Sequence, residues 1–313
     1  MYSPEYICLW HILDYSHKIL LGLCVYIFGF TAVILNGWLT YAFVKSRLLT
    51  FRSHLLLLAL CIASETKSLL TGFIFFGTSA LAGRWIFGTS TCHLFAFLRQ
   101  LLGVFQIMML TLISVERYIM SRPKRKVDLP LRFYIIGIAM CWSCAIVFSL
   151  PPLLGYGSYN CDVSGTMCDL DWRMLTSQQI GFNIMLMTFG AIIPVMVILC
   201  CLWTANCHTI RTGEFRSFDQ ISFTKTTTVM TTLIFSFWMP QAVLSLWIFV
   251  QNLHPPRGIP VALSVISPVS VEAAEIIPVL CYLTYDIRLR SGLLEICDRI
   301  RRRKIPERLF SKK

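Results

Sequence analysis

The stretch CHLFAFLRQLLGVFQIMMLTLISVERYIM, residues 92–120, decides the fold of this chain. One arginine, Arg99, lies in its first half, and Glu116, Arg117 and Tyr118 close it just before a basic run. The apolar sequence between them is long enough to cross a hydrocarbon core of ~30 Å at ~1.5 Å per helical residue. We therefore expect a membrane-spanning helix here, with the other helices of the protein packed around it.

The rest of the chain repeats this apolar pattern. Hydrophobic residues make up 56% of the 313 residues and charged residues 14%, whereas about a quarter of a soluble domain is charged. Six further apolar windows are each long enough to span a membrane; they cover residues 19–44, 53–78, 131–154, 178–207, 221–250 and 259–285. The sequence therefore predicts an all-α membrane protein, a seven-transmembrane helix bundle over residues 19–285.

The orientation of the bundle follows from its basic loops. The loops on one side, together with the C-terminal tail, hold 21 of the 28 lysines and arginines, and an excess of this kind is typical of the cytoplasmic side. The opposite loops offer Lys18, Arg84, Arg173 and Arg257. We expect residues 1–18 outside the cell, residues 286–313 inside it, and the chain in the plasma membrane.

The predicted cytoplasmic segment begins with an amphipathic helix, residues 286–304, the eighth helix of the chain. Isoleucines and leucines form one stripe of it and arginines fill the other face, as in helices that lie along anionic lipid headgroups. Cys297 near its end is a candidate for palmitoylation, with an unmodified cysteine as the alternative. Membrane lipids are thus predicted partners of this helix.

Five short motifs follow one another along the chain. GRWIFG at 83–88 precedes Cys92 and the Glu116-Arg117-Tyr118 triplet; the loop GTMCDLDW spans 165–172, FSFWMP spans 235–240 and IPVLC spans 277–281. In this order and spacing they resemble the rhodopsin class of G-protein-coupled receptors, whose signatures include FxxCWxP and NPxxY. The loop is similar to that of retinochrome, peropsin and RGR-like opsins. The resemblance extends over all seven spans and the terminal helix.

This resemblance implies a site for retinal, but the residue that would hold it differs. Opsins bind retinal as an imine on a lysine six residues before the Asn of NPxxY. That position is Val271 here, which has no amine, and the seventh window contains no lysine. The family's two counterion positions are matched by Phe95 and Asp162. We expect no cofactor and no covalent retinal, as in the nematode opsin-like serpentine receptors (nemopsins), which this chain resembles.

Four of the 13 cysteines fall on the predicted outer side, which is oxidising. We expect a disulfide between Cys92, at the start of the third span, and Cys168 in the long outer loop. A second bridge between Cys8 and Cys161 is left open.

The resemblance also assigns a switch. Arg117 would be held by the acid beside it and released towards a heterotrimeric G protein on activation. Its family partner on the sixth span is matched by Gln220, which predicts a weakened ionic lock. Pro240 removes a backbone hydrogen bond beneath Trp238, so we predict a hinge there that a ligand can bias. Pro278 is the proline of the motif that resembles NPxxY.

Charged side chains inside predicted spans are unfavourable unless they are paired or wetted, and so they mark candidate sites. The predicted ligand pocket consists of Lys67, Phe95, Arg99, Asp162, Trp238, Gln241, Val271 and Glu272. Within it, Lys67, Arg99 and Glu272 either form an ion-paired network or bind an acidic ligand. Glu275 follows Glu272 by three residues, on the same helix face, and is expected to pair with polar groups near Asn36 and Ser64. A further alternative is retinal bound to Lys67, from a different helix than in opsins.

These features predict a receptor and not an enzyme. The sequence contains no Gly-rich phosphate loop, metal-spaced His/Cys cluster or nucleophile elbow, and its basic loops fit membrane topology and not nucleic acid. We expect an opsin-like receptor that passes a small-molecule or retinoid signal to a heterotrimeric G protein. The alternatives are a retinoid-binding photoisomerase of the RGR type, a photoreceptor with a relocated lysine, and a transporter or channel, which the lack of internal repeats argues against.

Overall fold

The computed structural model describes residue 8, residues 13–45, 47–122, 129–172, 176–211, 218–253 and 258–285, and residue 290. Of the predicted outer segment, residues 1–18, the structure describes residue 8 and residues 13–18. Cys297 and the predicted helix of residues 286–304 fall outside it, apart from residue 290. The side chain of Gln220 also falls outside it, although its backbone belongs to a described helix.

Helices dominate the described residues. The first three spans are α1 (Tyr15–Lys45), the continuous run of α2 (Ser53–Lys67), η2 (Ser68–Gly77) and α3 (Thr78–Leu81), and α4 (Gly88–Met120), with η1 (Arg47–Thr50) joining the first two. The next three are α5 (Leu131–Ser149) with η3 (Pro151–Leu154), the run of α6 (Ser177–Met185), η4 (Leu186–Ile192) and α7 (Ile193–Arg211), and α8 (Phe218–Leu253). The last span is α9 (Val261–Ala274) followed by α10 (Ile277–Tyr285).

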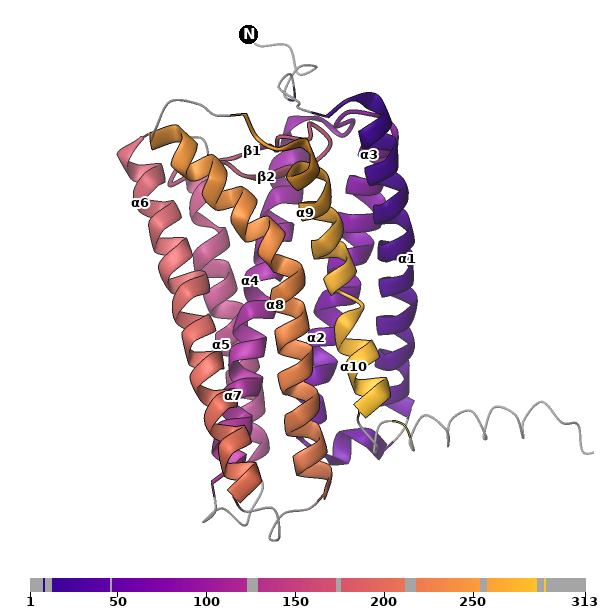
Figure 1. The fold of residues 1–313 in the computed structure, drawn as a ribbon, viewed down its shortest axis with the longest axis vertical. Helices are drawn as coiled ribbons and strands as arrows, with labels where there is room; N and C mark the ends of the chain where they lie inside the picture. The colour runs from indigo at the N-terminus through magenta and orange to yellow at the C-terminus, as the bar shows by residue number, and fades with distance from the viewer. Residues whose placement is uncertain are drawn as a thin grey trace, which may run out of the picture.

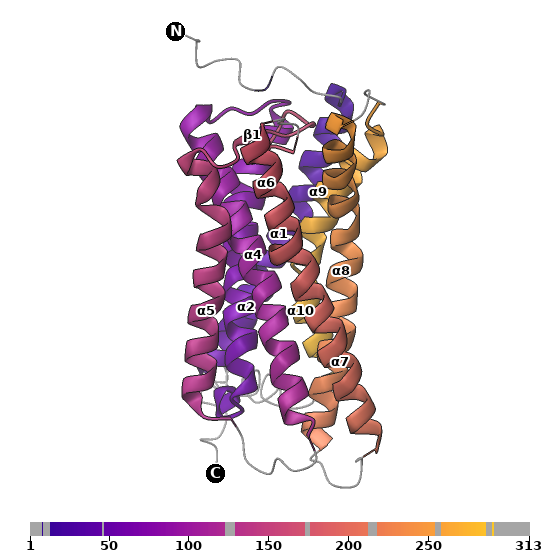
Figure 2. The ribbon, with the colours of Figure 1, turned by 90° about the vertical axis from the view of Figure 1, so that its left-hand side faces the viewer.

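The predicted seven-helix membrane bundle is confirmed. Six of these rods are long and apolar enough to cross a membrane, and α9 with α10, bent by 44°, makes a seventh. The rods stand side by side along one direction (Figure 1, Figure 2). The helix of the opening stretch, α4, packs against α2, α5, α7 and α8, so the sequence stretch 92–120 does form the helix on which the others assemble.

Pro278 explains why the seventh span is broken. A proline has no N–H to donate, and its ring clashes with the carbonyl four residues back, here that of Ala274. The helix α9 ends at Ala274, and in the turn that follows the amides of Glu275 and Ile276 donate to carbonyls three residues back, each at 3.2 Å. Glu272 lies before the break and Glu275 within it, which gives the two acids different partners.

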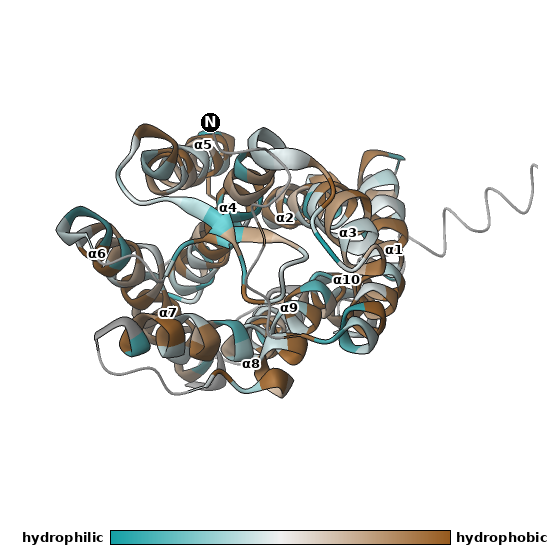
Figure 3. Cartoon of the chain, turned by 90° about the horizontal axis from the view of Figure 1, so that it is seen from above, coloured by the Kyte–Doolittle hydropathy of each residue, from teal (hydrophilic) through white to brown (hydrophobic). Residues whose placement is uncertain are grey.

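The bundle is apolar on its outside and contains charged side chains within its hydrophobic core. Seen from above, the ring of helices is largely coloured as hydrophobic (Figure 3). Trp203 on α7 is 76% exposed and Ile27 on α1 is 65% exposed, as suits side chains that face lipid. Lys67, Arg117 and Glu272 are buried. Because a buried charge is tolerated only when it is paired, these interior ions mark the places where function is to be sought.

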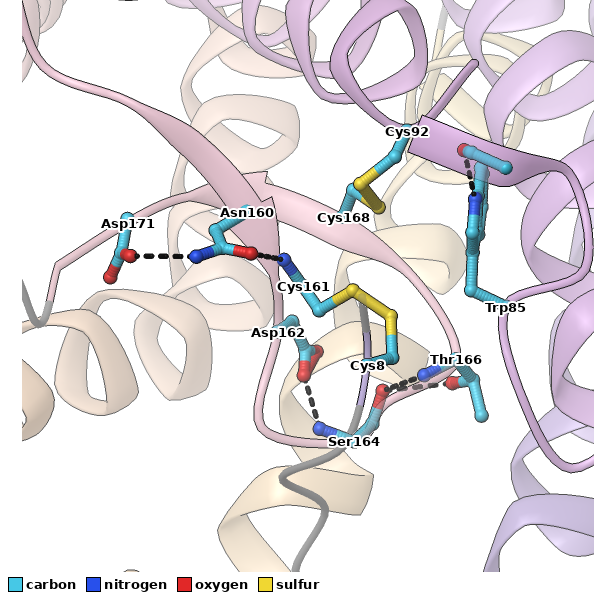
Figure 4. The surroundings of a disulfide bond; sticks show 11 residues. Cys8, Trp85, Cys92, Asn160, Cys161, Asp162, Ser164, Thr166, Cys168 and Asp171 are labelled. Atoms are coloured by element: carbon cyan, nitrogen blue, oxygen red, sulfur yellow. Dashed lines mark hydrogen bonds between the residues drawn. A yellow bond between two sulfur atoms is a disulfide. The ribbon is translucent and has the colours of Figure 1, made fainter. Parts of the chain in front are cut away.

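A two-stranded hairpin covers one end of the bundle, named here the hairpin end. Strands β1 (Tyr159–Cys161) and β2 (Cys168–Leu170) pair antiparallel, with Cys161 opposite Cys168. The expected disulfide Cys92–Cys168 ties the hairpin to α4, and the bridge that the sequence left open, Cys8–Cys161, ties it to the N-terminal segment (Figure 4). The Cα atoms are 5.4 Å apart in each bridge. Two covalent bonds therefore fix this cover over the helices.

The GRWIFG motif supports the tip of the hairpin. The backbone amide of Trp85 donates to the carbonyl of Gly165 in the tip at 3.1 Å. Gly165 has φ +70°, a conformation that costs glycine little and other residues more. The indole N–H of Trp85 donates to the carbonyl of Gly88 at 2.9 Å, which closes the motif on itself. This loop therefore positions the hairpin above the interior.

Candidate functional site

A cavity of about 470 Å³ lies beneath the hairpin, between α4, η4, α8 and α9. It is lined by five of the predicted pocket residues, namely Lys67, Arg99, Trp238, Gln241 and Val271. Three others do not line it: Phe95, Asp162 and Glu272. Most of the remaining wall is apolar, so the cavity suits an organic molecule with few polar groups.

Phe95 belongs to aromatic packing and not to the cavity. Its ring is fully buried, 5.2 Å from the ring of Trp85 and 6.1 Å from that of Phe75. These partners belong to the GRWIFG loop and to η2. The prediction that Phe95 is a pocket residue is therefore corrected, because it lies on the face of α4 that packs against η2.

Asp162 shapes the hairpin turn. Its carboxylate accepts a hydrogen bond from the backbone amide of Ser164, and its own amide donates to the carbonyl of Met167 at 3.1 Å (Figure 4). Loss of water contact raises the pKa of Asp162 to about 6, an effect that the Ser164 amide partly offsets. It lines a separate hollow of about 30 Å³ against α8, with Gln241. The prediction of Asp162 in the main pocket is thus corrected.

Lys67 and Glu275 form a buried ion pair next to the cavity. The ammonium Nζ of Lys67 lies 2.6 Å from Oε1 of Glu275 and donates to Oε1 of Gln106 at 3.0 Å. The same ammonium lies 5.7 Å from the centre of the Trp238 ring, within the range of a cation–π contact. Its carboxylate partner is Glu275 and not Glu272, the acid that the sequence had grouped with it.

Gln106 completes this cluster and was missed from the sequence. Its amide Nε2 donates to Oγ of Ser64 at 3.0 Å and to the second carboxylate oxygen of Glu275. Asn36 donates to the backbone carbonyl of Glu275 at 2.9 Å, at the break between α9 and α10. The signal was available: Gln106 follows Arg99 by two helical turns, on the same face of an otherwise apolar helix.

Arg99 forms a second ion cluster with a different character. Its Nε lies 3.6 Å from Oδ2 of Asp169, and its Nη1 lies 3.7 Å from Oε1 of Glu272. Within the described residues, neither oxygen of Glu272 nor Nη1 of Arg99 has a hydrogen-bond partner. Gly72 makes room for the acid, because a Cβ there would lie 2.5 Å from Oε2 of Glu272. Asp169, on β2, was missed as a partner.

At the opposite end of the bundle, Arg117 is held inward. Its guanidinium pairs with Glu116 and donates to Oγ of Ser53 at 2.7 Å. Ser53 in turn donates to Oε1 of Glu116 at 2.7 Å, and the hydroxyl of Tyr134 donates to the same oxygen at 3.1 Å. The arrangement expected for Glu116 and Arg117 is therefore present, with Ser53 and Tyr134 as partners that the sequence did not reveal.

A phenylalanine of α8 closes over this arginine. The ring of Phe223 lies 4.5 Å from the guanidinium carbon of Arg117, a distance at which a cation–π contact is attractive. Phe223 lies one helical turn after Gln220, whose side chain is outside the described residues. Tyr118, the last residue of the triplet, instead contacts Arg122, whose guanidinium lies 4.7 Å from its ring.

The two ends are joined by α8. Trp238 packs edge-on against Phe235 at 6.0 Å between ring centres and lines the cavity. Pro240 lies inside the helix two residues further on, and Phe223 lies four turns away, on Arg117. One continuous helix therefore contacts both the cavity and the buried arginine.

Comparisons with known proteins agree with this architecture. A model of the 7 transmembrane receptor (rhodopsin family) matches residues 35–271, more than half of the chain, so the chain belongs to that family. Human visual pigment-like receptor peropsin is 23% identical over 277 residues, covering 85% of this chain and 80% of that protein. Melanopsin of Rutilus rutilus is 32% identical over 190 residues, covering 60% of this chain and 38% of its own length. Squid rhodopsin has the same fold, with a TM-score of 0.83 at 18% identity over 96% of this chain and 91% of the other.

Proposed function

We propose that this member of the rhodopsin family is a receptor that binds a small molecule above Trp238 and activates a heterotrimeric G protein at its Arg117 end. One observation carries the proposal: α8 lines the cavity with Trp238 and covers Arg117 with Phe223. A ligand that prefers one position of Trp238 shifts the population of α8 conformations. No retinal imine is needed for this, and Val271 offers no amine.

The hinge for this shift is Pro240. Its ring removes one backbone hydrogen bond from α8, so bending there costs less than elsewhere in the helix. A tilt of the segment before Pro240 withdraws Phe223 from the Arg117 guanidinium. The arginine is then free to leave Glu116 and Ser53 and to contact a G protein.

The proposed orientation puts the hairpin end outside the cell and the Arg117 end in the cytoplasm, with the chain in the plasma membrane. The excess of basic residues near the Arg117 end supports it. The oxidised cysteines of the hairpin support it as well, because disulfides persist on the outer side.

The test is nucleotide exchange on purified G proteins by receptor reconstituted in lipid nanodiscs. Arg117→Ala should abolish receptor-dependent exchange, while Arg84→Ala, an exposed arginine at the hairpin end, should leave it at the wild-type rate. Exchange that is unchanged by Arg117→Ala would contradict the proposed mechanism.

A second candidate is a retinoid-binding photopigment that uses Lys67. Lys67 lines the cavity, and its amine lies 2.6 Å from Oε1 of Glu275. A carboxylate in that place would balance the charge of a protonated imine. Peropsin and melanopsin among the relatives make retinoids reasonable ligands to test. Purified protein mixed with 11-cis or all-trans retinal should then show a visible absorption band that Lys67→Ala removes. Absence of any band would reject this candidate.

A further inference from the structure

The polar groups that line the cavity differ in how fully they are bonded. Lys67 is bound to Glu275 and Gln106. Arg99 is 6% exposed, and among the described residues it makes two ion contacts, both longer than a hydrogen bond. Within the described residues no hydrogen bond from its guanidinium is found, and its Nη1 is buried without a partner. Arg99 therefore presents unused donors at the edge of an apolar cavity.

A guanidinium with free N–H groups selects an oxygen anion that can accept two of them side by side. A carboxylate does so with two parallel bonds of about 2.7–2.9 Å, which neither Asp169 at 3.6 Å nor Glu272 at 3.7 Å makes here. Asp169 lines the cavity beside Arg99 and is 20% exposed, and its Oδ1 accepts a hydrogen bond from the backbone amide of Leu170 at 2.8 Å, so its carboxylate already has a partner other than Arg99. Glu272 remains behind the guanidinium and does not line the cavity, so it is not an obstacle to a ligand approaching from the cavity.

The rest of the cavity wall is mostly apolar and favours contact with hydrocarbon. It includes Val104, Ile107, Leu170, Trp172, Trp238 and Val271. Burial of apolar ligand surface against such side chains favours binding. A ligand that satisfies both parts of the cavity has a long apolar body and one acidic end.

The way into the cavity is lateral. Its top is covered by the hairpin, which two disulfides hold down. Lining residues of both elements reach the lipid-facing surface: Ile192 of η4 is 55% exposed, and Met239, Val243 and Leu246 of α8 are 57%, 41% and 46% exposed. The cavity thus meets the bilayer between η4 and α8, at side chains that a molecule dissolved in lipid contacts first.

We propose that the ligand is a lipid-soluble carboxylic acid, which enters from the bilayer between η4 and α8 and is held by its carboxylate on Arg99. This inference rests on the proposed receptor function and names the ligand class of its cavity. Binding is non-covalent, and the apolar body lies towards Trp238.

Binding is measured with parinaric acid, a fluorescent polyene fatty acid, on receptor in phosphatidylcholine nanodiscs. Because Trp172 and Trp238 line the cavity, excitation of tryptophan should produce polyene emission when the acid binds. Arg99→Gln should weaken binding at least about ten-fold, the effect of losing a charge-assisted pair of hydrogen bonds. Arg84→Gln, the exposed control at the same end, should not weaken it. Equal affinity in both variants would overturn the proposal.

Competition experiments separate the contribution of the ligand's acid group from that of its apolar body. Oleic acid or all-trans retinoic acid should displace parinaric acid, and which of them does so at lower concentration identifies a straight-chain or a ring-bearing source. Oleyl alcohol at equal concentration should not displace it. Displacement by the alcohol as strong as by the acid would overturn the assignment of Arg99.

The lateral route is tested without disturbing the ion cluster. Val243→Trp fills the border between η4 and α8 and should slow parinaric acid association several-fold. Val250→Trp, on the same helix, 42% exposed and outside the cavity lining, should leave the rate unchanged. Equal association rates in the two variants would overturn the lateral entry, even where Arg99→Gln fails to fold.

Nucleotide exchange in the same nanodiscs distinguishes this inference from the receptor proposal. An acid that binds through Arg99 without changing exchange would overturn the receptor function and leave the ligand class standing. Exchange driven by a molecule without an acid group, in receptor that does not bind parinaric acid, would overturn the ligand class alone.

Discussion

Two buried ion clusters border the cavity, each with a cation and a carboxylate, and they differ in hydrogen bonding. Lys67 and Glu275 meet at 2.6 Å and share Gln106, so donors and acceptors are matched. Arg99 stands 3.6–3.7 Å from its two acids, and within the described residues its contacts stop short of hydrogen bonds. A charge with complete bonds supports the fold, whereas one with spare donors beside a cavity is available to a ligand. Burial of charge alone does not separate the two cases.

The largest effect on the unfolding free energy is expected from the fully hydrogen-bonded cluster of Lys67, Glu275 and Gln106. Glu275→Gln keeps the shape of the side chain but removes the carboxylate to which the buried Lys67 ammonium is hydrogen-bonded. Loss of one partner of a buried pair costs about 3–5 kcal/mol of unfolding free energy. Thermal unfolding of purified receptor in detergent measures this loss, and Lys67→Met combined with Glu275→Gln should recover most of it. A single variant that melts with the wild type would remove the contrast between the clusters.

A smaller effect on the unfolding free energy is expected from Asp162 in the hairpin. The pKa of Asp162 is about 6 in the folded chain against 3.8 in the unfolded chain, chiefly because water is excluded from it. The folded state therefore binds the proton more tightly, and this group adds stability as the pH falls through 6. Between pH 7.5 and 5 the gain is about 1 kcal/mol. Melting temperatures of wild type and Asp162→Asn should converge at pH 5 in proportion to this gain; parallel pH profiles would contradict it.

The smallest effect is expected from Glu272→Gln. Neither carboxylate oxygen has a hydrogen bond to lose within the described residues, and Arg99 retains Asp169 as a counter-charge. The substitution should change the unfolding free energy by less than about 1 kcal/mol. The matched comparison is with Glu275→Gln under identical conditions. Equal destabilisation by the two substitutions would show that incomplete bonding does not mark Arg99 as available.

The fold was predictable because lipid imposes a simple rule on sequence. A span needs about 20 apolar residues, and every predicted window coincides with an observed rod to within a few residues. The apolar windows did not predict the break in the last span. Pro278 was noted only as part of a motif, although its missing N–H is what ends α9 at Ala274.

The site was predictable in its residue types and less so in its pairings. Lys67, Arg99 and Glu272 were grouped because they are charged residues inside predicted spans, and the structure assigns Lys67 to Glu275 instead. Helical spacing cannot supply such pairings, since they depend on which faces of different helices meet. Phe223 was missed for the same reason: an apolar residue at helical spacing carries no sign that a guanidinium lies against it.

The most direct test of the central claim is the basal nucleotide exchange of the Phe223→Leu variant. If α8 restrains Arg117 through the Phe223 ring, loss of a cation–π contact of about 1 kcal/mol shifts the population about five-fold towards the active form. Receptor in nanodiscs with purified G protein should then exchange nucleotide several-fold faster than wild type without added ligand. Exchange at or below the wild-type rate, in a variant that remains folded, would contradict the account.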